Sequence, residues 1–155
     1  MHPELKLSFS VEIQVDKPVI VNATAEGGKR QLISILEGKV SGKINGVVLP
    51  GGIDSQIIQP DGICHLSARY GLQTDQGTVY IENNGIRRIP AEWRDRLFDQ
   101  DMSFFNQIPQ EDIYFRAVPK FEVYSDALRW MIESIFICTG QRTAEGVSLK
   151  FYELL

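Results

Sequence analysis

Residues 48–87 read VLPGGIDSQIIQPDGICHLSARYGLQTDQGTVYIENNGIR, and this stretch decides the fold. Turn-forming residues interrupt it three times, at Pro50-Gly51-Gly52, Pro60-Asp61-Gly62 and Asp75-Gln76-Gly77. The runs between these turns are rich in β-branched, aliphatic and tyrosine residues, which are typical of β-strands. Short strands joined by tight turns pair with their sequence neighbours, so the block predicts consecutive antiparallel strands.

The third turn predicts how the two strands around it pair. If Gln76-Gly77 forms a two-residue loop, Tyr70 faces Asn83 and Leu72 faces Ile81. One face of the hairpin is then apolar and carries Leu66, Ala68, Tyr70, Leu72, Val79 and Ile81. The other face carries Arg69, Gln73, Tyr80 and Glu82. A slip of one residue would mix the two sets, so the unmixed register is favoured.

Strand patterns continue on both sides of this block. Leu5–Val15 alternates apolar with polar residues along its whole length, which makes it the clearest strand in the chain. Further strands are expected at residues 18–25, 31–43, 47–49, 55–59, 63–74, 78–87, 113–123, 135–139 and 147–153. In the long strand at 31–43, a bulge is expected at Gly38 or Gly42.

The pattern as a whole indicates an all-β protein. We expect a single antiparallel β-barrel of about ten strands, calycin-like or similar, with one or two short helices. The barrel is expected to be one domain that spans residues 1–155. Closure is favoured because long strands with glycine bends suit a barrel, and closure removes the exposed sheet edges. One short helix is expected over residues 126–133, with Ser125 as its N-cap.

A helical and loop insertion at residues 89–112 interrupts the strands. Pro90 suits the first position of a helix, and Trp93, Leu97 and Phe98 recur at helical spacing. A short amphipathic helix is therefore expected over residues 90–101, followed by a loop over 102–112. The insertion is either a mobile cover or a fixed cap over one end of the barrel.

Composition excludes several function classes. The chain has 155 residues and a net charge of −4, with 16 basic and 20 acidic residues, which argues against a nucleic-acid partner. No stretch approaches the roughly 18 apolar residues of a membrane span, and the N-terminus lacks the apolar core of a signal peptide. We therefore expect no membrane partner and a cytoplasmic protein. Cys64 and Cys138 lie in apolar, strand-like runs and are expected to be buried free thiols.

Motifs for cofactors and metals are missing from the sequence. Neither a GxGxxG nor a GxxxxGK[ST] phosphate-binding motif is present. His65 follows Cys64 directly, and neighbours on a strand point to opposite faces, so the two cannot bind one metal ion together. The sequence predicts no cofactor and no metal site. What remains for chemistry is a set of carboxylates, arginines and aromatic residues on strands.

Several segments together resemble a known family. These are PGGIDSQIIQPDG, ARYGLQTDQGTVYIENNGIR, YFRAVPKFEV, FICTGQR and VSLKFYEL, in this order, with a helix containing Trp130 before the last two. They resemble the domain-of-unknown-function family 3237, also called uncharacterised protein family 0311, over nearly the whole chain. The resemblance implies a small β-barrel and names no reaction.

The resemblance also implies a set of site residues. The polar positions that match the family are Asp54, Arg69, Asn83, Arg116, Glu122 and Arg142, and the matching aromatic is Trp130. The chain departs from the family at Ser55, where tryptophan is common, and at Met131-Ile132, where the family has leucine and asparagine. The insertion at 91–112 also matches poorly. A pocket that uses the missing tryptophan as a wall would be wider or more polar here.

Three hypotheses of function follow. In the first, the barrel binds a small organic molecule, anionic or aromatic, with Arg69, Arg116 or Arg142 holding a carboxylate or phenolate. Its full ligand-binding set is Asp54, Arg69, Tyr80, Asn83, Arg116, Glu122, Trp130 and Arg142, with Tyr80 and Trp130 as aromatic walls. The alternative is an enzyme without metal or cofactor, in which Asp54 or Glu122 serves as a general base for isomerisation or cyclisation.

The third hypothesis is a structural or assembly protein, and a homo-oligomer is expected under all three. One conflict stays open at this level. Patterning places apolar strand faces inside, whereas the resemblance marks polar residues on the opposite faces. Either the polar residues line an internal cavity, or the interior is packed and they form ion pairs outside.

Overall fold

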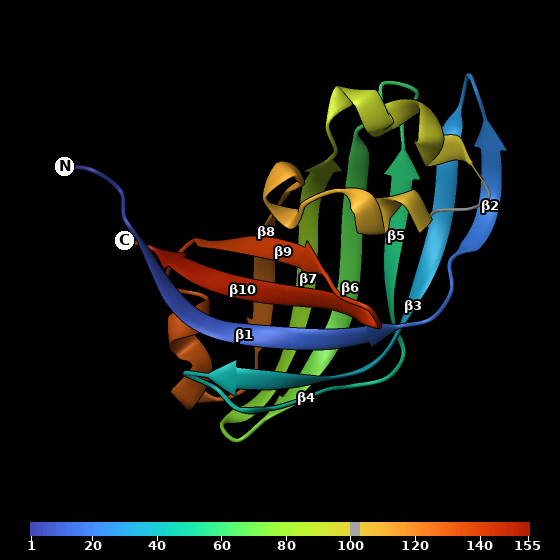
Figure 1. Ribbon diagram of the computed structural model, residues 1–155. Coiled ribbons are helices and arrows are strands. Elements are labelled where there is room, and N and C mark those ends of the chain that lie inside the picture. The colour runs from blue at the N-terminus through green and yellow to red at the C-terminus, as the bar shows by residue number, and fades with distance from the viewer. Residues whose placement is uncertain (100–102) are drawn as a thin grey trace.

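The computed structural model describes residues 1–99 and 103–155, and its ten strands belong to one antiparallel sheet that closes on itself (Figure 1). The strands are β1 (Leu5–Val15), β2 (Val19–Thr24), β3 (Gly28–Gly42), β4 (Gly46–Val48), β5 (Gly52–Ile58), β6 (Cys64–Thr74), β7 (Gly77–Arg88), β8 (Tyr114–Val123), β9 (Phe136–Arg142) and β10 (Gly146–Leu154). The closed ring runs β1-β10-β9-β8-β7-β6-β4-β3, and β3 pairs back with β1. The predicted all-β barrel is confirmed.

The long strand β3 makes closure possible. Its first half pairs with β2 and β5, and its second half pairs with β4 and β1. The change of partner includes a bulge at Leu36, because Gln14 pairs with Glu37 and Val15 with Ile35. The prediction of a bulge at Gly38 or Gly42 is therefore wrong by a few residues. Both glycines stay in register, where a Cβ atom would meet the backbone of β1.

The β6–β7 hairpin corrects the predicted register and confirms the predicted faces. Tyr70 pairs with Ile81 and Leu72 with Val79, so the loop is Asp75-Gln76 rather than Gln76-Gly77. The Thr74 hydroxyl donates a hydrogen bond of 2.6 Å to the Gly77 carbonyl across this two-residue loop. A shift of two residues preserves the side on which each side chain lies. Leu72, Val79 and Ile81 are accordingly buried.

The helices are shorter and more numerous than expected. Four 3₁₀-helices occur in the described part of the chain: η1 (Ala91–Phe98), η2 (Ser103–Gln107), η3 (Gln110–Asp112) and η4 (Asp126–Met131). The expected helix over 90–101 is thus a 3₁₀-helix that ends at Phe98, and residues 100–102 lie outside the described residues. The expected loop over 102–112 contains two further helical turns. Such short segments form i→i+3 hydrogen bonds, as the Asp99 N–H does to the Arg96 carbonyl at 3.1 Å.

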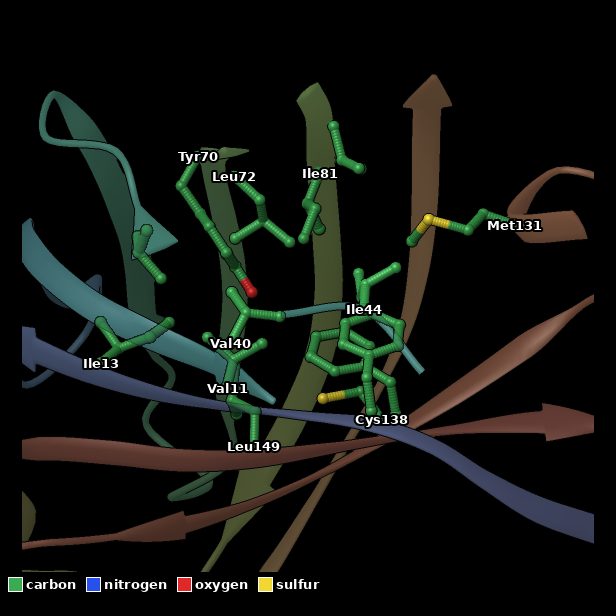
Figure 2. Packing of buried hydrophobic residues seen from close by; sticks show 14 of the residues in the cluster. Val11, Ile13, Val40, Ile44, Tyr70, Leu72, Ile81, Met131, Cys138 and Leu149 are labelled. Carbon is green, nitrogen blue, oxygen red and sulfur yellow. The ribbon is translucent and has the colours of Figure 1, made fainter. Parts of the chain in front are cut away.

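Two apolar clusters fill the molecule. The first is the barrel core, in which side chains from all sides of the ring converge, among them Val11, Val40, Leu72 and Leu149 (Figure 2). The second lies between the η1–η3 insertion and the barrel, and its members are Ile58, Cys64, Leu66, Ile89, Leu97, Phe104, Phe105 and Ile108. The insertion therefore packs onto one end of the barrel, above the ends of β5, β6 and β7 (Figure 1).

Cys64 and Cys138 are free and buried, as predicted. Among the helices of the described residues, none has the length and apolar character that crossing a membrane requires.

Candidate functional site

A cavity of about 350 Å³ lies beside the η1–η3 insertion, at the end of the barrel that the insertion covers. Its volume is within the range of small-molecule sites. Its wall is formed by the strand residues Gln31, Ile33, Asp54, Gln56, Arg87, Phe115, Gly140 and Arg142. The insertion contributes Phe105 and Gln110, and residues 15–18 and 143–147 form the rim.

Alternation along the strands explains why polar side chains reach this cavity. Arg87 lies on the same face of β7 as the buried Ile81, and Gln56 lies on the same face of β5 as the buried Ile58. Arg142 lies on the same face of β9 as the buried Cys138. Each strand therefore carries apolar residues into the barrel core and continues with a polar residue at the cavity end.

A chain of side-chain amides crosses the cavity wall. The Gln31 Nε2 donates to the Gln56 Oε1 at 2.8 Å, and the Gln56 Nε2 donates to the Asp54 Oδ2 at 2.7 Å. Arg87 Nη2 also lies 3.5 Å from the Gln56 Oε1. Gln31 and Gln56 are both buried, so these hydrogen bonds are shielded from water and hold the Asp54 carboxylate in one orientation.

Two arginines share one aromatic ring in the cavity. The guanidinium carbons of Arg87 and Arg142 lie 5.2 Å and 4.9 Å from the centre of the Phe105 ring. Within residues 1–99 and 103–155, neither arginine has a carboxylate at salt-bridge distance. Partial burial of the Arg142 guanidinium lowers its pKa, and the nearby positive charge of Arg87 lowers that pKa further. In the described residues, neither guanidinium therefore forms a direct ion pair, although Asp54 lies near enough to Arg87 for their charges to interact.

Asp54 is a half-buried carboxylate on the cavity wall. Burial raises its pKa above the ordinary value, while the hydrogen bond from Gln56 and the charge of Arg87 oppose this rise. Its Oδ2 accepts the Gln56 hydrogen bond, and its Oδ1 is buried without a hydrogen-bond partner. One acceptor atom of this carboxylate is thus left unused by the protein.

Further polar atoms continue below the cavity into the barrel. Asp54 pairs with Ala68 and Ala68 pairs with Asn83, so the three lie on one line across β5, β6 and β7. The Asn83 Oδ1 and the Tyr70 hydroxyl are buried without hydrogen-bond partners. Figure 2 shows the Tyr70 hydroxyl inside the barrel. Burial raises the pKa of the neighbouring Cys138 thiol to about 12, which leaves this thiol protonated and unreactive at neutral pH.

Metal ligands are not grouped in the described residues, where no cluster of three or more His, Cys, Asp or Glu side chains is arranged to hold an ion. Cys64 is buried and His65 is exposed, so the two point to opposite sides of β6 as predicted. The Cys64 thiol lies 3.7 Å from Arg87 and 3.8 Å from the Gln56 Oε1, and it completes the polar wall near Asp54.

Comparison with known proteins identifies the family. The model of the family described as "Protein of unknown function (DUF3237)" matches residues 3–154. The chain belongs to the DUF3237 family. A UPF0311 protein of Clostridium acetobutylicum is 48% identical over 148 residues, which cover 94% of this chain and 90% of that protein. The resemblance seen in the sequence is therefore confirmed.

Solved structures agree with the DUF3237 assignment. A protein of unknown function from Clostridium acetobutylicum has a TM-score of 0.90 and 45% identity, with 100% of this chain and 99% of that chain covered. A β-barrel-like protein from Acinetobacter baumannii has a TM-score of 0.81 and 24% identity, with 100% of this chain and 98% of that chain covered. The second likeness shows the fold alone.

The DUF3237 barrel brings three of the expected site residues to the cavity region. Asp54 and Arg142 line the cavity itself. Asn83 lies deeper in the barrel, in line with Asp54, and is 5% exposed. These three residues come from β5, β7 and β9, so only the folded sheet brings them to the same region of the barrel.

Four expected site residues lie on the outside of the barrel: Arg69, Tyr80, Arg116 and Glu122. The sequence left open whether these residues line an internal cavity or lie outside, and the alternation of side chains along β6, β7 and β8 places them outside. Arg69 pairs with Glu82 across the two strands at 3.7 Å, which is the outer ion pair that the alternative described. Glu122 is exposed and accepts a hydrogen bond from the Tyr124 hydroxyl at 2.9 Å.

Trp130 lies away from the cavity, in η4 near the β6–β7 turn. The cavity residue Arg87 is at the other end of β7, so Trp130 and the cavity occupy opposite ends of the barrel. The Trp130 ring packs edge-on against Phe9 at 6.5 Å, and the Lys43 ammonium lies 3.9 Å from its centre. Trp130 therefore closes the packed end of the barrel and is not a wall of the cavity.

Sequence reasoning missed Gln31, Gln56, Arg87, Phe105 and Phe115 as site residues. A signal for two of them was present. Continuing the period of two from Val79 and Ile81 places Arg87 inward, and the same step from Asp54 places Gln56 inward. No local pattern indicates Phe105, because only the packing of the insertion brings this ring over the two arginines.

Proposed function

We propose that this barrel binds a small organic anion with an aromatic group in the cavity. The observation that carries the proposal is the pair of arginines, Arg87 and Arg142, which face one ring and have no carboxylate partner in the described residues. Guanidinium groups in a partly desolvated site favour a carboxylate or phenolate, to which they donate paired hydrogen bonds.

The apolar side chains of the cavity support the aromatic part of this ligand. Phe105 and Phe115 stand on the wall, together with Ile33 and Ile113. An aromatic ring in such a place gains from burial of apolar surface and from edge or stacking contacts with phenylalanine rings. The wall thus offers apolar contact beside the positive charge, which is the combination that an aromatic acid requires.

Binding of benzoate, followed by isothermal titration calorimetry, tests the proposal. Arg142→Ala and Arg87→Ala should each weaken benzoate binding about 10-fold to 100-fold, because a hydrogen bond to a charged group contributes about 1.5–3 kcal/mol. Arg116→Ala and Arg69→Ala remove charge of the same sign from the outside of the barrel and should leave the affinity unchanged.

Two results would overturn the proposal. One is undetectable benzoate and 4-nitrophenolate binding by the unmodified protein at millimolar concentration. The other is an equal loss of affinity in the inner and outer arginine variants, because net charge alone would then explain binding. Cyclohexanecarboxylate serves as a further comparison, and it should bind more weakly than benzoate because it lacks the aromatic ring.

A further inference from the structure

Asp54 differs from the other carboxylates around the cavity. Among the described residues, the acidic groups that line the cavity are Asp16, Asp54 and Glu145. Asp16 and Glu145 are exposed at the rim, whereas Asp54 is half-buried on the inner wall. Only Asp54 is therefore held in a partly dry environment next to the space in which a ligand would bind.

The surroundings of Asp54 fix its position without using its full acceptor capacity. Gln56 holds the Oδ2 atom, and Gln31 holds Gln56, through hydrogen bonds of 2.7 Å and 2.8 Å. The Oδ1 atom has no partner. Asp54 also lines the cavity. A carboxylate that lines a binding cavity and is oriented by its neighbours is arranged to accept a proton from a bound molecule.

The arginines supply the complementary group. Removal of a proton from carbon next to a carbonyl leaves negative charge on the carbonyl oxygen, and this charge needs stabilisation by fixed positive groups. Arg87 lies close enough to Asp54 to influence its charge, and Arg142 faces the same ring as Arg87. The base and the oxygen-stabilising groups thus share one cavity of about 350 Å³.

We propose that Asp54 is the general base of a proton-transfer reaction on a small aromatic carbonyl compound, with Arg87 and Arg142 stabilising the enolate oxygen. This inference rests on the proposed ligand binding in the same cavity. The Asp54 carboxylate forms an O–H bond as the C–H bond breaks, and the C–H electron pair becomes the C=C bond of the enolate. The carbonyl π-electrons move to oxygen. In a β,γ-unsaturated carbonyl compound this enolate is a dienolate. The oxygen lone pair re-forms the carbonyl, the α,β double bond forms, and the electron pair at the γ-carbon takes the proton back from Asp54, which completes an isomerisation and regenerates the carboxylate.

The raised pKa of Asp54 is consistent with this role, because a base is most effective when its pKa approaches the working pH. The groups that face Asp54 and affect its charge come from three strands. They are Gln56 on its own strand, Arg87 of β7, and the Ser67 backbone N–H, the Cys64 thiol and the Tyr70 hydroxyl of β6. Arg87 is the only one of these that carries charge at neutral pH.

A generic probe of carbon-bound proton removal tests the proposal. In 5-nitrobenzisoxazole, a base removes the C3 proton, the C–H electron pair forms the nitrile, and the N–O bond breaks to leave a coloured phenolate. The unmodified protein should form this phenolate at least about 100-fold faster than Asp54→Asn, since general-base catalysis contributes at least this much. The rate should rise with pH and level off above the pKa of Asp54.

Matched controls separate this role from a general effect of charge. Glu122→Gln removes an exposed carboxylate from the outside of the barrel and should keep the full rate. Asp54→Ser provides a second inactive variant with a smaller side chain. Benzoate binding, measured on each variant, shows whether the cavity is folded and able to bind.

The outcomes distinguish the two proposals. If benzoate binds and the unmodified protein turns over the probe no faster than Asp54→Asn, the general-base role is overturned and ligand binding stands. If Glu122→Gln lowers the rate as much as Asp54→Asn, Asp54 is not the base. If benzoate fails to bind to the unmodified protein, the proposed function fails first. A rate that is lost only in the Asp54 variants supports the inference.

Discussion

At the scale of one residue, the buried Asp54 carboxylate in the cavity lowers the stability of the folded protein. Burial raises its pKa above the ordinary value of 3.8, so the folded protein binds the proton more tightly than the unfolded chain does. A carboxyl group of this kind destabilises the fold as the pH rises from the unfolded pKa through the folded pKa. The destabilisation is complete at neutral pH and absent in acid.

Asp54→Asn should therefore stabilise the protein at pH 7. The amide keeps the size of the side chain and an oxygen that can accept the Gln56 hydrogen bond, but it carries no charge. We expect a rise of about 2–4 °C in melting temperature, which corresponds to roughly 1 kcal/mol for a domain of this size. Calorimetry over a pH series should show the gain shrinking below about pH 4, where the aspartic acid is protonated in both states. A melting temperature that falls at pH 7, or a gain that persists unchanged in acid, would contradict this account. Glu122→Gln is the matched control and should shift the melting temperature little.

Single residues also show how far the site could be predicted. Asp54 and Arg142 were expected in the site and line the cavity, while Arg69 and Arg116 were expected there and lie outside. The difference depends only on which face of each strand points inward. The burial of Val79 and Ile81, which the sequence did predict, already assigns that face for β7 and places Arg87 inside. Polar character alone is therefore a weaker guide to a barrel site than the phase of the apolar residues on the same strand.

At the scale of elements, the contact between β8 and β9 shapes the cavity. Gly140 of β9 leaves room for the Phe115 ring of β8, since a Cβ atom on Gly140 would lie 2.6 Å from that ring. Both residues line the cavity. The glycine is thus required by packing and by the width of the site, and its φ angle is not positive.

Gly140→Ala should move Phe115 and narrow the cavity. We expect benzoate to bind several-fold more weakly, while acetate, which is smaller, keeps its affinity. Overpacking of this kind costs about 1–3 kcal/mol, so urea unfolding should also show a lower midpoint. Val118→Ala on the outer face of β8 is the control and should alter neither measurement. Unchanged benzoate affinity in a destabilised Gly140→Ala protein would show that Phe115 moves away from the cavity instead.

Elements were predicted well where the signal is local and less well where it is not. The bounds of β1 agree with the sequence pattern because its alternation is uninterrupted. The predicted β6–β7 register was two residues off. A side-chain hydrogen bond from Thr74 spans the turn, and the alternation of apolar and polar residues does not predict such a bond. The insertion was recognised by its changed period, but its packing through Phe104 and Phe105 depends on contacts with Ile58, Cys64 and Leu66, which are distant in sequence.

At the scale of the whole molecule, closure joins the first strand to the last and to the third. β1 pairs with both β10 and β3, and the two chain ends lie close together (Figure 1). No sequence pattern predicts that β3 changes its partner strand at Leu36, because this change is set by the geometry of the closed ring. The closed ring places an apolar core at one end and leaves the other end for the cavity and the insertion.

The two apolar clusters predict two levels of stability within one molecule. Phe151 belongs to the barrel core and Phe104 to the cluster under the insertion, and both are fully buried. Replacing either by alanine removes about 3–5 kcal/mol of local packing. Phe151→Ala should lower hydrogen-exchange protection in every strand, because closure makes the ring one cooperative unit. Phe104→Ala should lower protection mainly in residues 91–99 and 103–112 and leave β1 and β10 protected. Mass-spectrometric hydrogen exchange resolves the two patterns.

Phe115 packs against both clusters. If the Phe104→Ala variant loses protection equally in β1 and in the η1–η3 insertion, the Phe115 ring couples the two clusters into a single unit. A separate insertion would instead open around Phe105 while the barrel stays closed, and the arginines of the cavity would then gain a route by which a ligand enters.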